Sequence, residues 1–171
     1  MNNKALVIID LQNDYLWDQR KHMFSYDTAS LIETVNRTAA EYKQNGWTVI
    51  YIGQIFPNLI TNKLLIGFSI KNTPGAELFS GLNLVSDLYF EKNLPDSFSS
   101  APFRKYIEDN NIKELAVCGL DECGCVGATA KGAVKRGYNV SLISQATVSR
   151  FPKKKIRKMR TALKELGVKY I

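Results

Sequence analysis

Three side chains with complementary chemistry follow predicted strands of this sequence. Asp10 directly follows the apolar run of residues 5–9, and Lys92 and Cys125 each come shortly after a later predicted strand. A thiol is nucleophilic as its anion, which a nearby ammonium and a helix N-terminus favour. A carboxylate within reach accepts the thiol proton and later returns it to a leaving group, while a lysine keeps that carboxylate ionised and oriented. In this set, an aspartate and a lysine do the work for which other enzymes use histidine.

The elements that position these residues alternate between strands and helices. Apolar runs predict strands at residues 5–9, 47–52, 87–90, 114–118, 138–143 and 168–171, and helical periodicity predicts helices at 28–44, at 125–136 and through the basic segment from 153. This alternation is typical of a parallel sheet covered by helices on both faces. Because the carboxyl ends of parallel strands line one crevice, we expect Asp10, Lys92 and Cys125 to converge there.

The connection at residues 53–86 interrupts this alternation. It is long, apolar in places, and contains the turn signal TPG at residues 73–75. Connections longer than about 15 residues usually form lids, binding loops or interfaces. We therefore expect this segment to cover a site or a partner subunit.

Length and composition predict a single globular domain over residues 1–171. The chain has 171 residues, of which 45% are hydrophobic and 23% charged, which is ordinary for a folded domain. No apolar run approaches the roughly 20 residues that span a bilayer, and the N-terminal apolar run is too short for a signal peptide. We therefore expect a cytoplasmic protein without membrane contact.

The three cysteines, Cys118, Cys123 and Cys125, are an odd number within a short segment. Without an export signal, this pattern favours reduced thiols over a disulfide framework. A structural zinc site needs four ligands, and the single histidine of the chain, His22, lies far from the cysteines in sequence. We expect neither a metal nor another cofactor.

The net charge of +7 is concentrated in residues 153–160, where six of eight residues are basic. Such a run fits either a patch for nucleic acid or another anionic surface, or the solvated face of a helix. Ile156, Met159, Leu163 and Leu166 follow helical spacing, and no stacking aromatics interleave with the basic residues. We therefore interpret the run as an amphipathic helix and expect no nucleic-acid partner.

Four segments, taken in order, resemble the isochorismatase-like cysteine hydrolases, the group that includes nicotinamidases. They are ALVIIDLQNDY at residues 5–15, NTPGAEL at 72–78, EK at 91–92 with SF at 97–98, and VCGLDECGCVGATA at 117–130 with RGYNV at 136–140. The resemblance runs from about residue 4 to about residue 149. At three separate places, the predicted strand, the reactive residue that follows it and the spacing between them agree with the family pattern.

This resemblance implies a three-layer α/β/α fold around a six-stranded, mainly parallel, Rossmann-like sheet. It also implies a hydrolase that cleaves a small amide or related C–N bond through a thioester. In this triad Cys125 is the nucleophile, Asp10 the general base and Lys92 its partner. A small-molecule substrate and a homo-oligomer, either dimer or tetramer, are the partners that the resemblance implies.

The resemblance further implies a cis peptide bond between Leu120 and Asp121. The backbone N–H groups of Asp121 and Cys125 would then form the oxyanion hole. Tyr15 stands where the family places an aromatic wall of the substrate pocket, and Phe98 is expected near it.

The sequence departs from the family pattern at two places. Nicotinamidases bind a metal through an Asp-x-His motif after the second strand and a further histidine, whereas residues 52–57 read IGQIFP. This difference argues against a metal-dependent nicotinamidase. Where the family often has Ala-Thr-Asp before the nucleophile, residues 121–123 read DEC, which adds an acid and a second thiol and leaves the substrate open.

Two other classes of protein fit the same residues. A redox protein would use Cys123 and Cys125, with or without Cys118, as a dithiol. A binding or scaffold protein would keep the fold without the chemistry. Among enzymes, isochorismatase itself cleaves a vinyl ether and needs no cysteine, so a cysteine at position 125 argues against it.

Overall fold

The computed structural model describes residues 3–171 and contains one six-stranded sheet. The strands are β1 (Lys4–Ile9), β2 (Thr48–Gln54), β3 (Tyr89–Lys92), β4 (Glu114–Leu120), β5 (Asn139–Val148) and β6 (Lys169–Tyr170). Their order is β3-β2-β1-β4-β5-β6, and every neighbouring pair is parallel. The predicted six-stranded parallel sheet is therefore confirmed.

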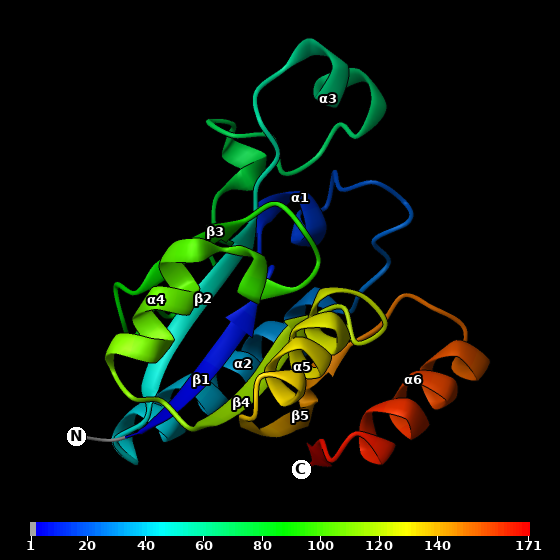
Figure 1. Cartoon of the computed structure of the whole chain (residues 1–171). Coiled ribbons are helices and arrows are strands. Elements are labelled where there is room, and N and C mark those ends of the chain that lie inside the picture. The colour runs from blue at the N-terminus through cyan, green and yellow to red at the C-terminus, as the bar shows by residue number, and fades with distance from the viewer. Residues whose placement is uncertain (1–2) are drawn as a thin grey trace.

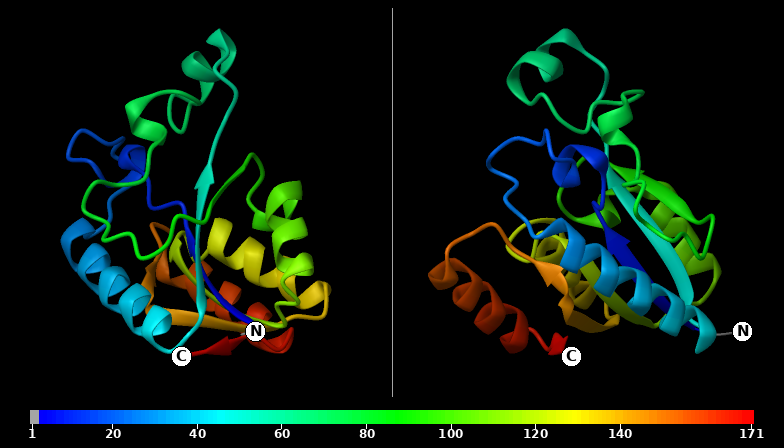
Figure 2. Two further views of the ribbon diagram at one scale, coloured as in Figure 1. Left: turned by 90° about the vertical axis from the view of Figure 1, so that its left-hand side faces the viewer. Right: turned by 180° about the vertical axis from the view of Figure 1, so that it is seen from behind.

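Helices cover both faces of this sheet (Figure 1). They are α1 (Asn13–Leu16), α2 (Thr28–Gln44), α3 (Ile60–Leu65), α4 (Ala101–Asp109), α5 (Cys125–Lys135) and α6 (Lys153–Glu165), with 3-10 turns η1 (Pro74–Ala76) and η2 (Ser97–Ser99). Figure 2 shows α2 on one side of the sheet and α4 and α5 on the other. Within residues 3–171, none of the helices combines the length and the apolar character that crossing a membrane requires.

The core consists of two apolar layers that follow the alternation of side chains along the strands. On β1, Leu6 and Ile8 pack in the layer under α2, which contributes Leu31 and Val35. The side chains between them, such as Val7, pack in the layer under α4, α5 and α6. Because both faces are covered, the central strands are apolar over most of their length, as expected for a parallel sheet.

The predicted elements are present with shifted ends, and three helices, α1, α3 and α4, have no counterpart among them. β5 continues to Val148, five residues beyond its predicted end. α4 begins after Ser100 and carries Phe103 and Ile107, four residues apart, on its buried side. The apolar spacing that marks a helix was therefore present in this segment, although only over two turns.

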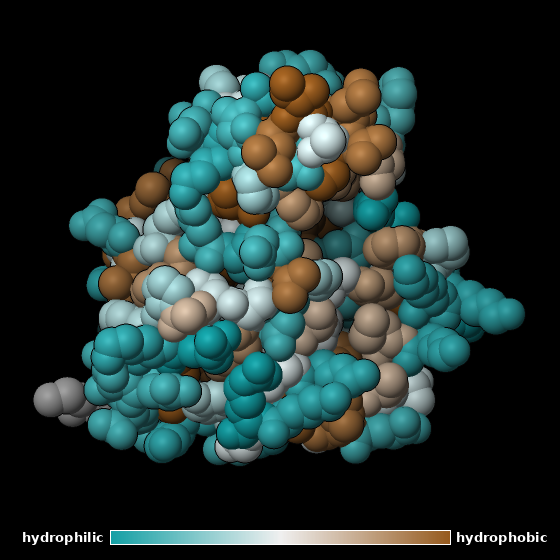
Figure 3. All heavy atoms as spheres, turned by 45° about the horizontal axis from the view of Figure 1, so that its top comes forward, coloured by the Kyte–Doolittle hydropathy of each residue, from teal (hydrophilic) through white to brown (hydrophobic). Residues whose placement is uncertain are grey.

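Residues 53–86 divide into a buried and an exposed part. Phe56 and Phe68 line a cavity that is described below. By contrast, α3 and its flanks carry exposed apolar side chains, namely those of Leu59, Ile60, Leu64 and Leu65. The space-filling view shows brown side chains gathered on the part of the surface where α3 lies (Figure 3). The expected homo-oligomer stays a prediction, and this face is where we expect the contact.

The backbone is unusual where β1 and β4 end side by side. Asp10 has a φ of 57°, a region that residues other than glycine rarely adopt. Gly119 has a φ of 108°, and a Cβ atom there would lie 2.2 Å from the backbone oxygen of Ile9. Only glycine fits at position 119, so the two strand ends approach closely at the edge of the sheet where Asp10 projects.

Candidate active site

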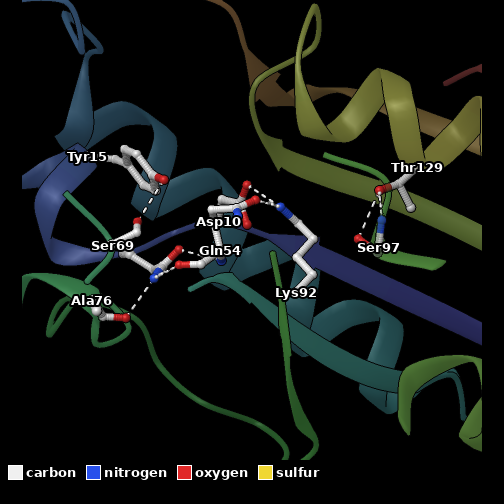
Figure 4. A network of polar contacts seen from close by, with 9 residues as sticks. Asp10, Tyr15, Gln54, Ser69, Ala76, Lys92, Ser97 and Thr129 are labelled. Atoms are coloured by element: carbon white, nitrogen blue, oxygen red, sulfur yellow. Dashed lines mark hydrogen bonds and ion pairs between the residues drawn. The ribbon is translucent and has the colours of Figure 1, made fainter. Parts of the chain in front are cut away.

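Asp10 and Lys92 form a buried ion pair at the carboxyl ends of β1 and β3. The Lys92 Nζ atom lies 3.0 Å from Asp10 Oδ2, and the two side chains are 0% and 4% exposed. Lys92 also donates a 2.7 Å hydrogen bond to Oε1 of Gln54, the last residue of β2. Figure 4 shows these side chains pointing toward one another from neighbouring strands. The predicted convergence of these two residues is present in the structure.

Cys125 completes the group from the first position of α5. Its thiol is close enough to the Asp10 carboxyl and the Lys92 ammonium for both to affect its pKa, which burial raises most. The side chain is half-buried and faces the same cavity as Asp10. The second Asp10 oxygen, Oδ1, is buried and receives no hydrogen bond from a nitrogen or oxygen donor of residues 3–171.

Burial and the neighbouring charges shift the pKa of the Cys125 thiol in opposing directions. Burial is the largest cause that raises the pKa of the Cys125 thiol to about 12; the negative charge of Asp10 adds to the rise, and Lys92 opposes it. For Lys92, burial lowers the pKa, but Asp10 and Cys125 together raise it above its ordinary value. Burial and the Asp10 carboxylate therefore oppose the thiolate form of Cys125, whereas the Lys92 ammonium and the helix N-terminus favour it.

The backbone turns toward the cavity between β4 and α5. The Leu120–Asp121 peptide bond is cis, as the resemblance predicts. The Asp121 carbonyl accepts hydrogen bonds from the N–H groups of Gly124 and Val126, which closes a tight turn before α5. Within residues 3–171, the N–H groups of Asp121 and Cys125 form no hydrogen bond to another backbone group. Both are therefore free to donate to a ligand.

An aromatic cavity of about 290 Å³ opens above Cys125. Its walls include Tyr15, Phe24, Phe56 and Phe68, whose rings meet edge to face with centroids 4.8 to 6.1 Å apart. The Tyr15 hydroxyl pairs with Ser69 Oγ at 2.8 Å, which fixes its ring. Tyr15 therefore lies in the cavity wall, where the sequence predicts it.

Phe98 lies outside this cavity. It is 1% exposed and packs against Phe103 and Tyr138 in the layer under α4 and α5. Hydrogen bonds from Ser97 to Thr129 of α5 hold η2 against that helix, with Phe98 directed into the core. The structure thus does not bring Phe98 to the other expected substrate-binding residue.

The three residues before Gly124 have separate environments. Asp121 accepts hydrogen bonds from Tyr26, Ser149 and the N–H groups of Cys123 and Arg150. The Cys123 thiol pairs with Ser149 and lies apart from the Asp10–Lys92 pair.

Glu122 points away from the cavity mouth. It is 2% exposed and forms a two-bond ion pair with Arg160 of α6, at 2.6 and 2.8 Å. The Tyr170 hydroxyl also donates to it at 3.2 Å. The extra acid therefore fastens α6 to the loop that precedes Cys125, and one basic residue of the 153–160 run serves this contact.

A family model for the isochorismatase domain matches residues 4–168. The chain belongs to the isochorismatase family.

Relatives of this chain are named for different activities. N-carbamoylsarcosine amidase from Arthrobacter sp is 24% identical over 88% of this chain and 61% of that protein. An Arabidopsis thaliana protein named a probable inactive nicotinamidase is 27% identical over 98% of this chain and 91% of that protein. The crystal structure of Pyrococcus horikoshii pyrazinamidase in complex with zinc superposes with a TM-score of 0.85, at 24% identity over 99% of both chains, which shows a shared fold.

The residues at the end of β2 and after it in this isochorismatase-family chain are not suited to bind a metal ion. Gln54 Oε1 accepts from Lys92, and Phe56 offers no donor atom. No group of three or more His, Cys, Asp or Glu side chains within residues 3–171 is arranged to hold a metal ion. We therefore derive no step through a metal.

Gln54 and Arg150 are two of the cavity residues that were not among the predicted site residues. Gln54 ends β2 and Arg150 comes two residues after β5, so both lie at the same edge of the sheet as Asp10 and Lys92. Asp10 was identified because the carboxyl ends of parallel strands line one crevice, and the same rule applies to Gln54 and Arg150. Neither an amide nor a solvent-facing arginine suggests catalysis by its type, which is why that rule alone did not single them out.

Proposed function

We propose that this isochorismatase-family protein is a cysteine-dependent amidohydrolase of small amides, with Cys125, Asp10 and Lys92 as its triad. Membership in the family, together with a relative named as an amidase, supports an amidohydrolase that acts on C–N bonds. The single observation that carries the finer proposal is the meeting of a thiol, a buried carboxylate and a buried ammonium at the floor of one cavity.

In the first half of the reaction, Cys125 becomes acylated. Its sulfur attacks the amide carbonyl carbon while the thiol proton passes to Asp10. The carbonyl oxygen becomes an oxyanion, to which the N–H groups of Asp121 and Cys125 donate. Asp10 then gives the proton to the departing nitrogen, the C–N bond breaks, and ammonia or an amine leaves a thioester on Cys125.

In the second half, water hydrolyses the thioester. Asp10, again a carboxylate, takes one proton from the water as its oxygen attacks the carbonyl carbon. The C–S bond breaks, a carboxylic acid leaves, and the sulfur recovers its proton. Lys92 keeps its positive charge throughout and holds Asp10 in place, with Gln54 fixing the Lys92 ammonium.

A resting thiol is compatible with this cycle. Because the proton moves only from sulfur to the neighbouring Asp10 carboxylate, the thiolate forms as the substrate arrives and need not be populated beforehand. The donors that await the oxyanion stabilise the negative charge that this transfer creates; one such donor is typically worth about 3 to 4 kcal/mol of barrier.

Cys125→Ser and Cys123→Ser test the proposal together. Both variants are assayed for ammonia release against a panel of small primary amides. We expect Cys125→Ser to lose turnover of every amide that the wild type hydrolyses, and Cys123→Ser to retain it, because Cys123 pairs with Ser149 rather than with Asp10 and Lys92. Wild-type turnover in Cys125→Ser would remove the thiol from the mechanism.

The same pair of variants distinguishes the alternatives. A dithiol redox protein needs both sulfurs, so loss of activity in Cys123→Ser as well would favour it. All three cysteines of the chain are free thiols in this structure. A binding protein without chemistry would hydrolyse no amide in the panel in any variant.

A further inference from the structure

We propose that the substrate of this site carries a carboxylate, and that Arg150 binds it at the cavity wall. This inference rests on the proposed amidohydrolase function and names its substrate class: a small amide with an apolar body and an anionic group. Arg150 would then be a specificity-determining residue, set apart from the triad that performs the chemistry.

Arg150 presents a positive charge to the cavity without a protein partner. Its side chain lines the same cavity as Cys125. Within residues 3–171 the guanidinium forms no ion pair or hydrogen bond; its contacts are with the ring of Phe24 at 5.3 Å and the ring of Phe151 at 4.8 Å. A guanidinium has five N–H donors in a planar fork, so its donors remain available to a ligand.

The backbone holds Arg150 in this position. Its N–H group donates to Asp121 Oδ2 at 2.8 Å, and the neighbouring Ser149 hydroxyl donates to Asp121 Oδ1 at 2.6 Å. Stacking on two aromatic rings then restricts the side chain. Less conformational entropy is lost when a ligand binds to such a preorganised group.

The acids of the cavity wall are already engaged within the protein. Asp10 pairs with Lys92. Asp121 accepts four hydrogen bonds, which come from Tyr26, Ser149 and two backbone N–H groups. Neither carboxylate forms an ion pair with Arg150, so the unmatched charge in the wall is positive. A ligand carboxylate would supply the missing partner and form two parallel hydrogen bonds with the guanidinium.

The surroundings of Arg150 extend this preference for anions. The basic run of α6 begins three residues further along, and Lys153, Lys154 and Lys155 are exposed. Lys155 Nζ lies 3.4 Å from the centroid of the Phe151 ring, on which Arg150 also stacks. Positive charge beside a cavity mouth raises the local concentration of anionic ligands. Part of the +7 net charge of the chain would then serve to attract anionic ligands to the cavity.

Two alkylating reagents of similar size test the inference without a known substrate. Iodoacetate carries a carboxylate and iodoacetamide a neutral amide, and both modify Cys125. The measured quantity is the ratio of their second-order rate constants at pH 9, with the site of modification read by fragmentation mass spectrometry. Taking a ratio cancels any change in the pKa of the thiol.

We expect Arg150→Gln to lower the ratio of iodoacetate to iodoacetamide reactivity about tenfold. Arg150→Lys should keep most of the ratio, because it keeps the charge. Arg157→Gln is the matched control: it removes the same charge from an exposed position of α6 that does not line the cavity, and should leave the ratio unchanged. An unchanged ratio in Arg150→Gln, or an equal fall in Arg157→Gln, would overturn the inference.

A hydrolysis assay separates this inference from the proposed function. For an amide that the wild type hydrolyses, the acid is compared with its methyl ester. We expect Arg150→Gln to raise KM for the acid about tenfold and to leave kcat and the KM for the ester unchanged. Equal effects on acid and ester would refute the role of Arg150 while leaving the amidohydrolase proposal intact. Absence of hydrolysis would refute that proposal, and the alkylation ratio would still decide whether the cavity favours anions.

Discussion

Asp10→Asn is expected to accelerate alkylation of Cys125 while it strongly slows amide hydrolysis. The negative charge of Asp10 raises the pKa of the thiol, and the positive charge of Lys92 lowers it. Replacing the carboxylate by an amide leaves Lys92 unopposed, so the pKa falls. Below that pKa, each unit of decrease raises the thiolate fraction about tenfold. Hydrolysis should nevertheless fall about 10²- to 10⁴-fold, because no group remains to protonate the leaving nitrogen.

The measurement is the pH profile of iodoacetamide modification. For the wild type we expect the rate to rise with pH through the alkaline range toward an inflection near about 12, and for Asp10→Asn we expect the inflection at lower pH. Asp18→Asn removes a carboxylate from an exposed position outside the cavity and serves as the control. Slower alkylation in Asp10→Asn than in the wild type would show that Asp10 favours the thiolate in the resting protein, contrary to our account.

Lys92→Met is expected to be the most destabilising substitution in the triad. The Lys92 and Asp10 side chains are almost completely buried, so loss of the ammonium leaves a carboxylate in the core without its counter-charge. Breaking a buried pair from one side typically costs about 3 to 5 kcal/mol of folding free energy. The free energy of unfolding, measured by urea denaturation, should fall by that amount.

A double variant separates electrostatics from packing. Asp10→Asn combined with Lys92→Met removes both charges and should recover much of the stability that Lys92→Met loses. If the double variant is as unstable as the single one, the loss comes from packing around Lys92 and not from the unpaired carboxylate. In either case the double variant should not hydrolyse amides.

The meeting of Asp10 and Lys92 was predictable because parallel strands place their carboxyl ends along one edge. Asp10 and Lys92 are far apart in sequence, yet one follows β1 and the other ends β3, and the register of the sheet brings them to 3.0 Å. The protonation state was not predictable in the same way. It depends on how deeply Cys125 is buried and on the balance between Asp10 and Lys92, which are properties of packing.

Phe98 illustrates a second limit. The family resemblance implies that Phe98 lies near Tyr15, but a 3-10 turn presents its side chains in several directions. Contacts between Ser97 and Thr129, separated by 32 residues, decide that Phe98 faces the core. Conversely, Phe24 and Arg150 reach the cavity from segments that no motif marked, and only the folded chain brings them together.

The most direct test of the account is to trap the acyl group. The wild type is mixed with an amide that it hydrolyses, quenched in acid within the first turnovers, and examined by peptide mass spectrometry. We predict an adduct on Cys125 with the mass of the acyl portion of the amide, absent from Cys125→Ser and lost when turnover is allowed to finish. Amide hydrolysis that proceeds with no adduct on Cys125, and at an undiminished rate in Cys125→Ser, would contradict the proposed mechanism.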